Sequence, residues 1–265
     1  DTAVLSTNLD AVLCFADNQI FLPHIYRFCA RHEIRMVPYI GRTHSSSGGV
    51  HGFAMNTLFH LGTLRWFRRG PAISKIEEVR QELLQLGVKD VKVAPVGLDF
   101  SVMKSDFAAY DRAALRREFG LLPEDMVICT VGRMGPEKNP LDLVEIYQQV
   151  REQKPCKLLL VGEGTQSEDL KTKIAASKWK SDIVLIDRIP NDQIWKVYAT
   201  ADYFVNLCRT EIFGMAILEA MYYGVSVAAL AAPGPSVTLR DMPGHKLCSS
   251  YEEIRDWLLA EHPAQ

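Results

Sequence analysis

The chain has 265 residues, of which 48% are hydrophobic and 23% are charged, and its formal net charge at pH 7 is −2. This composition is that of an ordinary globular protein, and the small net charge provides no basic field of the kind that attracts nucleic acid. The longest apolar runs, 183–186 and 225–232, are far too short to span a bilayer.

The first hundred residues alternate between short apolar runs and helical patterns. They predict strands at 11–16, 34–40, 71–74 and 91–94, and helices at 20–32, 50–67 and 75–86. Gly87 follows the third helix where a C-cap glycine is expected. Residues 95–99 (PVGLD) have turn chemistry without a helical period, so we place a domain boundary near residue 103.

The second half repeats this alternation more strongly. It predicts strands at 126–131, 157–161, 182–187, 203–207 and 225–230, and helices at 140–150, 168–176, 191–200, 213–223 and 251–259. Asn191 is the expected N-cap of the helix at 191–200. Apolar runs that alternate with helices indicate βαβ units and a parallel sheet buried on both faces. We therefore predict the α/β class, with two Rossmann-like domains at 1–103 and 104–265 and a cleft between them.

Six cysteines are spread along the chain, at positions 14, 29, 129, 156, 208 and 248. None forms a C-x-x-C pair, and several lie in or beside apolar runs. This distribution favours buried thiols in a reducing compartment over metal ligands or disulfides, and it predicts a cytoplasmic protein.

A loop with two cations follows the strand at 126–131. It runs GRMGPEKNP from Gly132 to Pro140 and contains Arg133 and Lys138. Ligands of open parallel sheets bind beyond the carboxyl ends of the strands, where glycines let the backbone approach and a helix N-terminus attracts anions. Two cations in such a loop suit a diphosphate. The alternative is that both side chains make surface ion pairs.

Two glutamates, Glu211 and Glu219, flank the start of a predicted helix. They lie roughly 9–12 Å apart along the helix axis, which is too far for the carboxylate pair of a glycosidase. This spacing suits two hydroxyl-rich parts of one ligand, such as a ribose and a sugar joined by a diphosphate. The free N–H groups of Phe213, Gly214 and Met215 would then face the phosphates. The alternative is a helix-capping Glu211 and a solvated Glu219.

The stretch EIFGMAILEAMYYGVSV at 211–227 resembles the E-x7-E motif and its surroundings in retaining glycosyltransferases of the GT-B fold, the group 1 (family 4) enzymes. VGR at 131–133, followed by PEK at 136–138, resembles the donor-phosphate loop of that family. Further matches are VGEG at 161–164 and VGLD at 96–99. The chain is therefore identified as a member of this family.

The resemblance implies a role for each matching residue. Arg133 and Lys138 would bind the donor diphosphate and stabilise the departing nucleotide in place of a metal ion, so neither a metal nor another cofactor is expected. Glu219 would bind the ribose hydroxyls, and Glu211 would face the transferring sugar as a catalytic residue. The other expected donor-binding residues are Gly132, Arg188, Ile189, Phe213, Gly214 and Met215. Transfer would retain the anomeric configuration, with catalysis by electrostatic stabilisation of the leaving group.

Two segments of the first domain also point to function. Residues 39–46 (YIGRTHSS) resemble the family's Gly-Thr-Phe-His-Thr segment, so His44 would contact the donor sugar or the acceptor as a catalytic residue, with a packing or turn role as the alternative. Residues 58–69 combine apolar and aromatic side chains with Arg65, Arg68 and Arg69. Such a helix fits peripheral association with the cytoplasmic face of an anionic membrane; the alternative is a core helix that ends in a solvated basic turn.

The chain also departs from the family's pattern. It begins inside the first domain, without the usual opening strand and glycine-rich loop, so the first domain is expected to be incomplete, and it stops soon after the helix at 251–259. Residues 232–237 (APGPSV) stand where relatives have an acidic residue in a Gly-Gly-x-x-Glu segment.

The predicted function is metal-independent, retaining transfer of a sugar from a nucleotide-sugar donor to a glycan, lipid or small-molecule acceptor, with no nucleic-acid partner. One alternative is a non-catalytic GT-B-like subunit that binds a partner glycosyltransferase or senses a nucleotide sugar. The incomplete first domain favours this alternative, whereas the intact set of Arg133, Lys138, Glu211 and Glu219 argues against it. A second alternative, a nucleotide-sugar epimerase, would need an acid and a base flanking the sugar, and the sequence offers no convincing pair.

Overall fold

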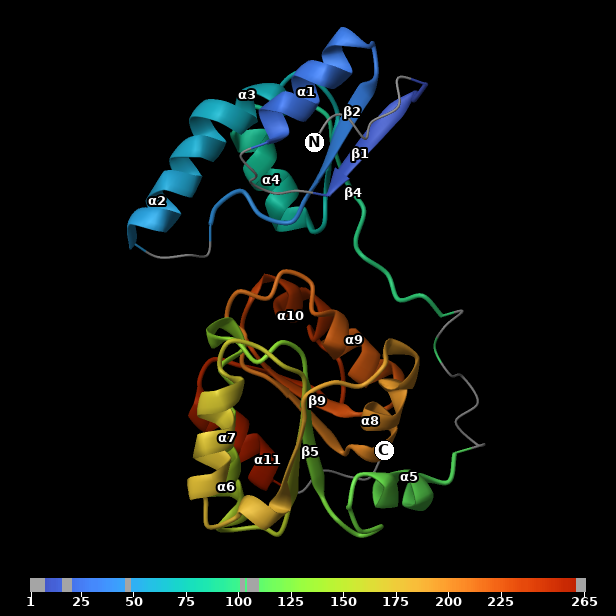
Figure 1. The fold of residues 1–265 in the computed structure, drawn as a ribbon, viewed down its shortest axis with the longest axis vertical. Coiled ribbons are helices and arrows are strands. Elements are labelled where there is room, and N and C mark those ends of the chain that lie inside the picture. Colours follow the sequence, from blue (N-terminus) through green and yellow to red (C-terminus); the bar gives the residue numbers. More distant parts are fainter. Residues whose placement is uncertain (1–7, 16–20, 46–48, 101–102, 104–109, 261–265) are drawn as a thin grey trace. The chain divides into compact units, whose positions relative to one another are not determined.

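The computed structural model describes residues 8–15, 21–45, 49–100, 103 and 110–260. The chain divides into two units, which we call unit 1 (Asp1–Val96) and unit 2 (Gly97–Gln265) (Figure 1). The boundary expected near residue 103 falls beside residues 101–102 and 104–109, which lie outside the described ones. Each unit contains one parallel sheet, as the alternation of strands and helices predicts.

Unit 1 has a four-stranded parallel sheet in the order β1-β2-β3-β4. Its strands are β1 (Ala11–Phe15), β2 (Arg35–Ile40), β3 (Ala72–Ser74) and β4 (Val91–Val93). Its helices are α1 (Leu22–Arg31), α2 (Gly49–Leu58), α3 (Leu64–Phe67) and α4 (Glu77–Gln85). The helix predicted at 50–67 is confirmed, with a π-helical turn at Phe59–Thr63 between α2 and α3. Gly87 follows α4 with a φ of 85°, the left-handed conformation that a helix C-terminus favours.

Unit 2 has a six-stranded parallel sheet in the order β10-β9-β8-β5-β6-β7. The strands are β5 (Val127–Val131), β6 (Lys157–Val161), β7 (Ile183–Ile186), β8 (Tyr203–Asn206), β9 (Ser226–Leu230) and β10 (Lys246–Cys248). The helices are α5 (Arg112–Glu118), α6 (Pro140–Arg151), α7 (Ser167–Ala176), α8 (Trp195–Thr200), α9 (Met215–Tyr222), α10 (Pro233–Thr238) and α11 (Tyr251–Leu259). The doubly wound Rossmann-like prediction is confirmed for this unit.

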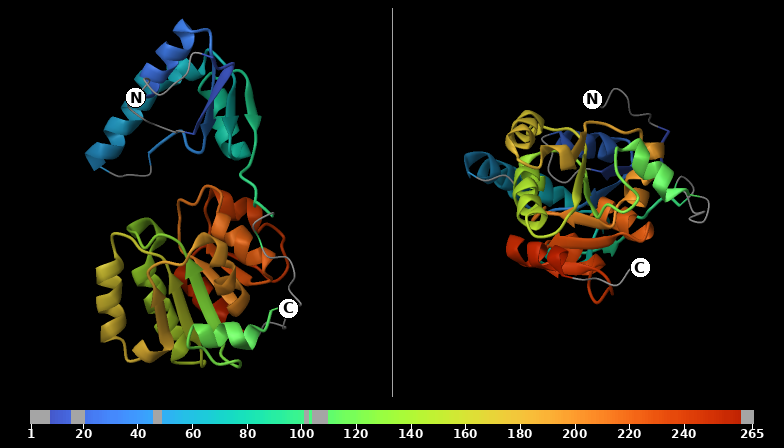
Figure 2. Two further views of the ribbon diagram at one scale, coloured as in Figure 1. Left: turned by 45° about the vertical axis from the view of Figure 1, so that its right-hand side comes forward. Right: turned by 90° about the horizontal axis from the view of Figure 1, so that it is seen from below.

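Helices cover both faces of the unit 2 sheet, because alternate residues of each buried strand point to opposite sides. On one face, Ile128 and Leu158 pack in a core with side chains of α6, α7 and α11. On the other face, Cys129 and Leu159 pack in a core with side chains of α8 and α9. Figures 1 and 2 show the sheet between these two helical layers. The carboxyl ends of the strands are thereby left for loops.

Some local predictions are wrong. The helix expected at 191–200 is a 3₁₀ turn, Asn191–Gln193, followed by α8, and Asn191 does not cap it because Pro190 occupies the cap position and the turn begins directly after it. Helix α9 begins at Met215 because Gly214, with a φ of 82°, cannot continue a right-handed helix. Helices α5 and α10 and the short strand β10 were not predicted.

The six cysteines are free; Cys14 is half-buried and the other five are buried, as expected. None of the helices in the described part of the chain has the length and apolarity that crossing a bilayer requires.

Candidate functional site

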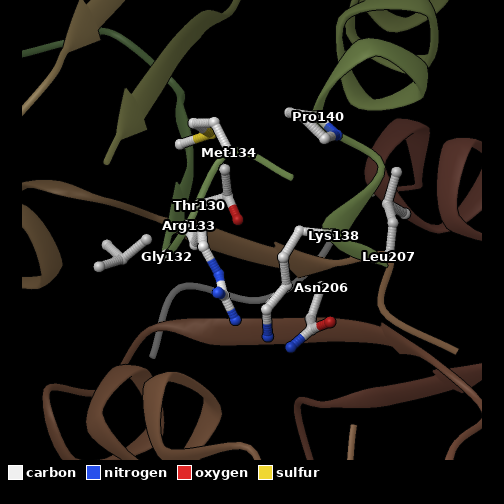
Figure 3. A pocket seen from close by; sticks show the side chains of 9 residues that line it. Thr130, Gly132, Arg133, Met134, Lys138, Pro140, Asn206 and Leu207 are labelled. Carbon is white, nitrogen blue, oxygen red and sulfur yellow. The ribbon is translucent and has the colours of Figure 1, made fainter. Parts of the chain in front are cut away.

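A pocket in unit 2 lies where the strand order changes direction. From β5 the chain proceeds outward through β6 and β7, and it then returns to place β8 on the other side of β5. The loops that follow β5 and β8 diverge at this point and leave a crevice, which is where open α/β sheets bind ligands. The pocket is lined by Thr130, Val131, Gly132, Arg133, Met134, Lys138, Pro140, Asn206 and Leu207 (Figure 3).

The loops after β5 and β6 are held together through their backbones. Gly132 N donates to Val161 O at 3.0 Å, and Met134 N donates to Glu163 O at 3.1 Å. A Cβ on Gly162, whose φ is 137°, would lie 1.8 Å from Gly132 O, so only glycine permits this approach. Close backbone contact therefore fixes this side of the pocket.

The two predicted cations occupy different environments. Arg133 is 74% exposed, and its Nε lies 3.2 Å from Glu137 Oε1. Lys138 is partly buried, and its Nζ lies 2.5 Å from Glu211 Oε2. Both side chains make the ion pairs that the alternative interpretation expects, but the partner of Lys138 is itself a candidate site residue. In Figure 3, the nitrogen-bearing ends of Arg133, Lys138 and Asn206 point the same way.

Asn139 ties the cationic loop to β8. It adopts the left-handed conformation, with a φ of 51°, between the 3₁₀ turn Pro136–Lys138 and α6. Its Nδ2 donates to Leu207 O at 3.0 Å. Asparagine tolerates this conformation better than most residues do, and its amide joins the loop that follows β5 to the residue that follows β8.

Glu211 stands beside the pocket with three donors around its carboxylate. Besides Lys138, Asn206 Nδ2 donates to Glu211 Oε2 at 3.4 Å, and the backbone N–H of Gly214 also stabilises the charge. Burial alone would raise the pKa of the Glu211 carboxyl, but these donors outweigh burial and lower the pKa below its usual value. Glu211 is therefore an ionised, engaged carboxylate, and the Gly214 amide faces it in this structure.

The segment 232–237, noted as a departure from the family's pattern, contacts the backbone of the loop that carries Glu211. Gly234 N donates to Glu211 O at 2.9 Å. A Cβ on Gly234 would lie 2.7 Å from the backbone of Phe213, so this contact too requires glycine. The segment contributes backbone support here instead of an acidic side chain.

Glu219 lies within α9, and its carboxylate accepts a hydrogen bond from a tyrosine. Tyr198 Oη donates to Glu219 Oε2 at 2.6 Å. Burial raises the pKa of the Glu219 carboxyl, and the bond from Tyr198 offsets only part of that effect. Glu219 is thus half-buried and hydrogen-bonded, unlike the solvated side chain of the alternative interpretation.

Eight predicted site residues are not among those that line the pocket: Glu211, Phe213, Gly214, Met215, Glu219, Arg188, Ile189 and His44. Arg188 is 85% exposed, and its Nε is 4.0 Å from Glu163 Oε1. Ile189 packs against the core beneath α8 and α9. His44 belongs to unit 1, where it is exposed and its Nδ1 lies 3.5 Å from Thr43 Oγ1. The roles assigned to these residues stay predictions.

Two residues of this region were not singled out from the sequence. Asn206 is a buried polar residue at the end of an apolar strand, and that break in the apolar run is the signal that would have identified it. Tyr198 resembles a core residue in its helix, and nothing in the pattern marks its hydroxyl as a partner of Glu219.

No group of three His, Cys, Asp or Glu side chains that could hold a metal ion occurs among the described residues. The side chains of Arg133, Lys138 and Asn206, which line the pocket, can donate hydrogen bonds to an anion.

A family model described as "Glycosyl transferases group 1" matches residues 111–251, which include every pocket residue together with Glu211 and Glu219. A D-inositol 3-phosphate glycosyltransferase of Segniliparus rotundus is 31% identical over 170 residues, which are 62% of this chain and 37% of the relative. An alpha-monoglucosyldiacylglycerol synthase of Streptococcus pneumoniae is 24% identical over 193 residues, which are 69% of this chain and 44% of the relative. The chain thus spans about two fifths of the length of these relatives.

Solved structures share the fold. HepE of Anabaena, in complex with UDP and glucose, superimposes with a TM-score of 0.74 at 17% identity, and the match covers 94% of this chain and 67% of that chain.

Proposed function

The chain belongs to the group 1 glycosyl transferases and has the GT-B fold, and from this premise we propose that it transfers a sugar from a nucleotide-sugar donor whose diphosphate binds in the unit 2 pocket. The observation that carries the proposal is the convergence of Arg133, Lys138 and Asn206 at the carboxyl ends of β5 and β8. Cations beside a glycine-clamped loop are what a diphosphate needs. The structural neighbour HepE, solved with UDP and glucose, supports a donor of this class.

Each side chain has a distinct part in the proposed reaction. Lys138 and Arg133 neutralise the diphosphate as the bond to the sugar breaks, which lowers the energy of the leaving nucleotide. Glu219 accepts hydrogen bonds from the ribose, and Glu211 faces the transferring sugar. Because Lys138 is paired with Glu211 in this structure, the incoming diphosphate must compete with that carboxylate for the ammonium group.

Three finer features of the reaction are part of the proposal. Transfer proceeds without a metal ion, since the two cations supply the charge that a metal would provide. It retains the anomeric configuration, as the resemblance of the 211–227 stretch to the retaining enzymes implies. His44 contacts the donor sugar or the acceptor.

The acceptor is a hydroxyl group on a polyol, glycan or lipid. The names of two relatives, a D-inositol 3-phosphate glycosyltransferase and an alpha-monoglucosyldiacylglycerol synthase, support this range. The family and these named relatives favour a catalytic role over the non-catalytic subunit that the sequence left open.

Calorimetric titration of the chain with UDP, GDP and ADP, with and without a chelator, tests the donor site. We expect micromolar to millimolar binding of one nucleotide, unchanged by the chelator and lost in Arg133→Ala. Lys171→Ala, which removes an exposed lysine of α7, is the matched control. Product analysis with the matching nucleotide sugar and a panel of acceptors then tests transfer, and NMR of the product reports its anomeric configuration. Absence of binding to all three nucleotides would overturn the proposal.

We also infer that unit 1 associates peripherally with an anionic membrane, at the cytoplasmic face. Val50, Phe53 and Leu61, on the segment from α2 to α3, are 86%, 73% and 76% exposed, and they are the most exposed large hydrophobic side chains in the described chain. The same segment ends in Arg65, Arg68 and Arg69, and residues 34–76 contain no Asp or Glu. Its other side packs inward through Phe59 and Phe67, so the core-helix alternative accounts for only one face.

Co-sedimentation with vesicles tests this association. We expect binding to phosphatidylglycerol vesicles, weak binding to phosphatidylcholine vesicles, and loss of binding when Phe53 and Leu61 are both changed to serine. Leu122→Ser, which removes an exposed leucine of unit 2, should bind normally. Equal sedimentation of the double variant and the wild type would exclude this surface.

A further inference from the structure

We propose that Tyr198 is a positioning residue that holds the Glu219 carboxylate in the orientation that binds the ribose hydroxyls of the donor nucleotide. The inference rests on the proposed function, because it takes Glu219 as the ribose acceptor. It adds to that function a residue from a different helix, which neither the family motif nor the pocket lining includes.

The contact is short and directional. Tyr198 Oη donates to Glu219 Oε2 at 2.6 Å, within the range of a strong O–H···O⁻ bond. It joins α8 to α9 across 21 residues of sequence. Within the described residues Glu219 has no ion pair, and this hydroxyl is the donor that contacts it.

The tyrosine ring is fixed by its surroundings. Its side chain is fully buried. Its ring stacks on Tyr223 at a centroid distance of 5.9 Å with an interplanar angle of 6°, and it tilts against Phe204 at 6.1 Å. A ring packed on two sides has one position for its hydroxyl, so the hydroxyl constrains the carboxylate and not the reverse.

A neutral donor suits a site that must recognise neutral hydroxyls. A lysine or arginine in place of Tyr198 would donate several hydrogen bonds and occupy more of the carboxylate lone pairs. The tyrosine donates once, to Oε2, and leaves Oε1 and the remaining lone pair of Oε2 as acceptors. Burial raises the pKa of Tyr198 well above its usual value, so the hydroxyl stays a donor at every physiological pH.

The test compares ribose selectivity in wild type and in Tyr198→Phe, using the full chain. This substitution removes the hydroxyl and keeps the ring that packs on Tyr223 and Phe204. Calorimetry with UDP, 2′-deoxy-UDP and 3′-deoxy-UDP, or the corresponding nucleotides if another base is preferred, measures the loss of affinity when a hydroxyl is removed. We expect Tyr198→Phe to weaken UDP binding by about tenfold and to weaken binding of the least favoured deoxynucleotide by about twofold or less.

Two further variants separate positioning from structure. In a Glu219→Gln background, Tyr198→Phe should change the selectivity no further, because both variants remove the same oriented acceptor. Tyr147→Phe removes another buried hydroxyl of unit 2, which donates to Cys156 O at 3.2 Å, and it should leave nucleotide selectivity unchanged.

The outcomes are distinguishable. If Tyr198→Phe weakened ribonucleotide and deoxynucleotide equally, Tyr198 would be merely structural and this inference would fail while the donor site stood. Wild-type binding without any preference for the ribonucleotide would also refute it. If the wild type bound no nucleotide at all, the proposed function would be wrong and this inference with it.

Discussion

The two sides of the unit 2 pocket are built differently. On the β5–β6 side, glycine backbones approach each other so closely that a side chain at Gly162 would overlap Gly132 O. On the β8–β9 side, an ion pair and a hydrogen bond position the two glutamate side chains: Lys138 pairs with Glu211, and Tyr198 donates to Glu219. On the proposed function, the first side is preorganised for a ligand, whereas the second would exchange at least one of its contacts when a diphosphate binds. Substitutions should therefore damage the fold on the first side and alter ligand affinity on the second.

The largest expected effect is on the backbone side. Gly162→Ala places a Cβ 1.8 Å from Gly132 O at a φ of 137°, so we expect the free energy of unfolding to fall by about 3 kcal/mol. Urea unfolding measures the change. Gly97→Ala, where no atom lies within 4 Å of the added Cβ, should stay within about 0.5 kcal/mol of wild type. Equal stability of both variants would contradict the backbone clamp.

On the charge side, Lys138→Met should have the largest effect on ligand binding. It removes a cation from the pocket and keeps the length of the side chain, and it leaves Glu211 without its counter-ion. We expect calorimetry to show UDP affinity lower by about 10- to 100-fold. Lys171→Met should bind UDP as wild type does. Unchanged affinity in Lys138→Met would remove this lysine from the donor site.

Glu211→Gln should have a smaller effect of opposite sign. Loss of the carboxylate charge releases Lys138 from its ion pair, so UDP should bind about three- to tenfold tighter in calorimetry. The matched control is Glu137→Gln, which should change UDP affinity by less than about twofold because its partner Arg133 is exposed. Weaker binding by Glu211→Gln would show that the carboxylate assists the nucleotide rather than competing with it.

The smallest expected effects concern stability and pH, and they differ between the two glutamates. The lowered pKa of Glu211 means that its stabilisation is present above the ordinary carboxyl pKa and is lost as the pH falls through its own value. The raised pKa of Glu219 means that its charge destabilises the fold at neutral pH and that this cost disappears in acid. Urea unfolding should therefore find Glu211→Gln less stable than wild type at pH 7 and Glu219→Gln more stable, each by about 1 kcal/mol or less. The Glu219→Gln difference should disappear as the pH falls to the ordinary carboxyl pKa of about 4.3, whereas the Glu211→Gln difference should begin to shrink only below that value. Differences of the same sign at pH 7 would contradict this contrast.

Much of the fold could be predicted because unit 2 alternates continuous buried strands with helices, a pattern that permits few topologies. The failures were short or irregular elements. Helix α10 has six residues, with two prolines and a glycine, and β10 is a three-residue edge strand, so neither has enough length for a period to appear. Asn191 was misassigned because capping preference was considered without the proline that precedes it.

The candidate site could be predicted from the sequence where a residue's place follows directly from the end of a strand. Arg133, Lys138 and Glu211 each follow a strand end, and Glu219 follows from the spacing of the motif. The contacts between these residues were not predictable, because β5 and β8 are distant in sequence and adjacent only through the strand order. The bond from the Tyr198 hydroxyl to Glu219 could not be predicted, because helical periodicity identifies a buried ring but not the partner of its hydroxyl group.

Every residue that lines the pocket, together with both glutamates, lies in the single stretch 130–219, inside the 111–251 segment that the family model matches. The proposed donor site is therefore contained in one continuous part of unit 2. If the proposed function holds, exchanging this one stretch between related chains should exchange the nucleotide preference in a single step. A graft that exchanges this stretch should run from residue 110 to residue 260, because α11, beyond the segment that the family model matches, packs Ile254 and Leu258 into the core of unit 2.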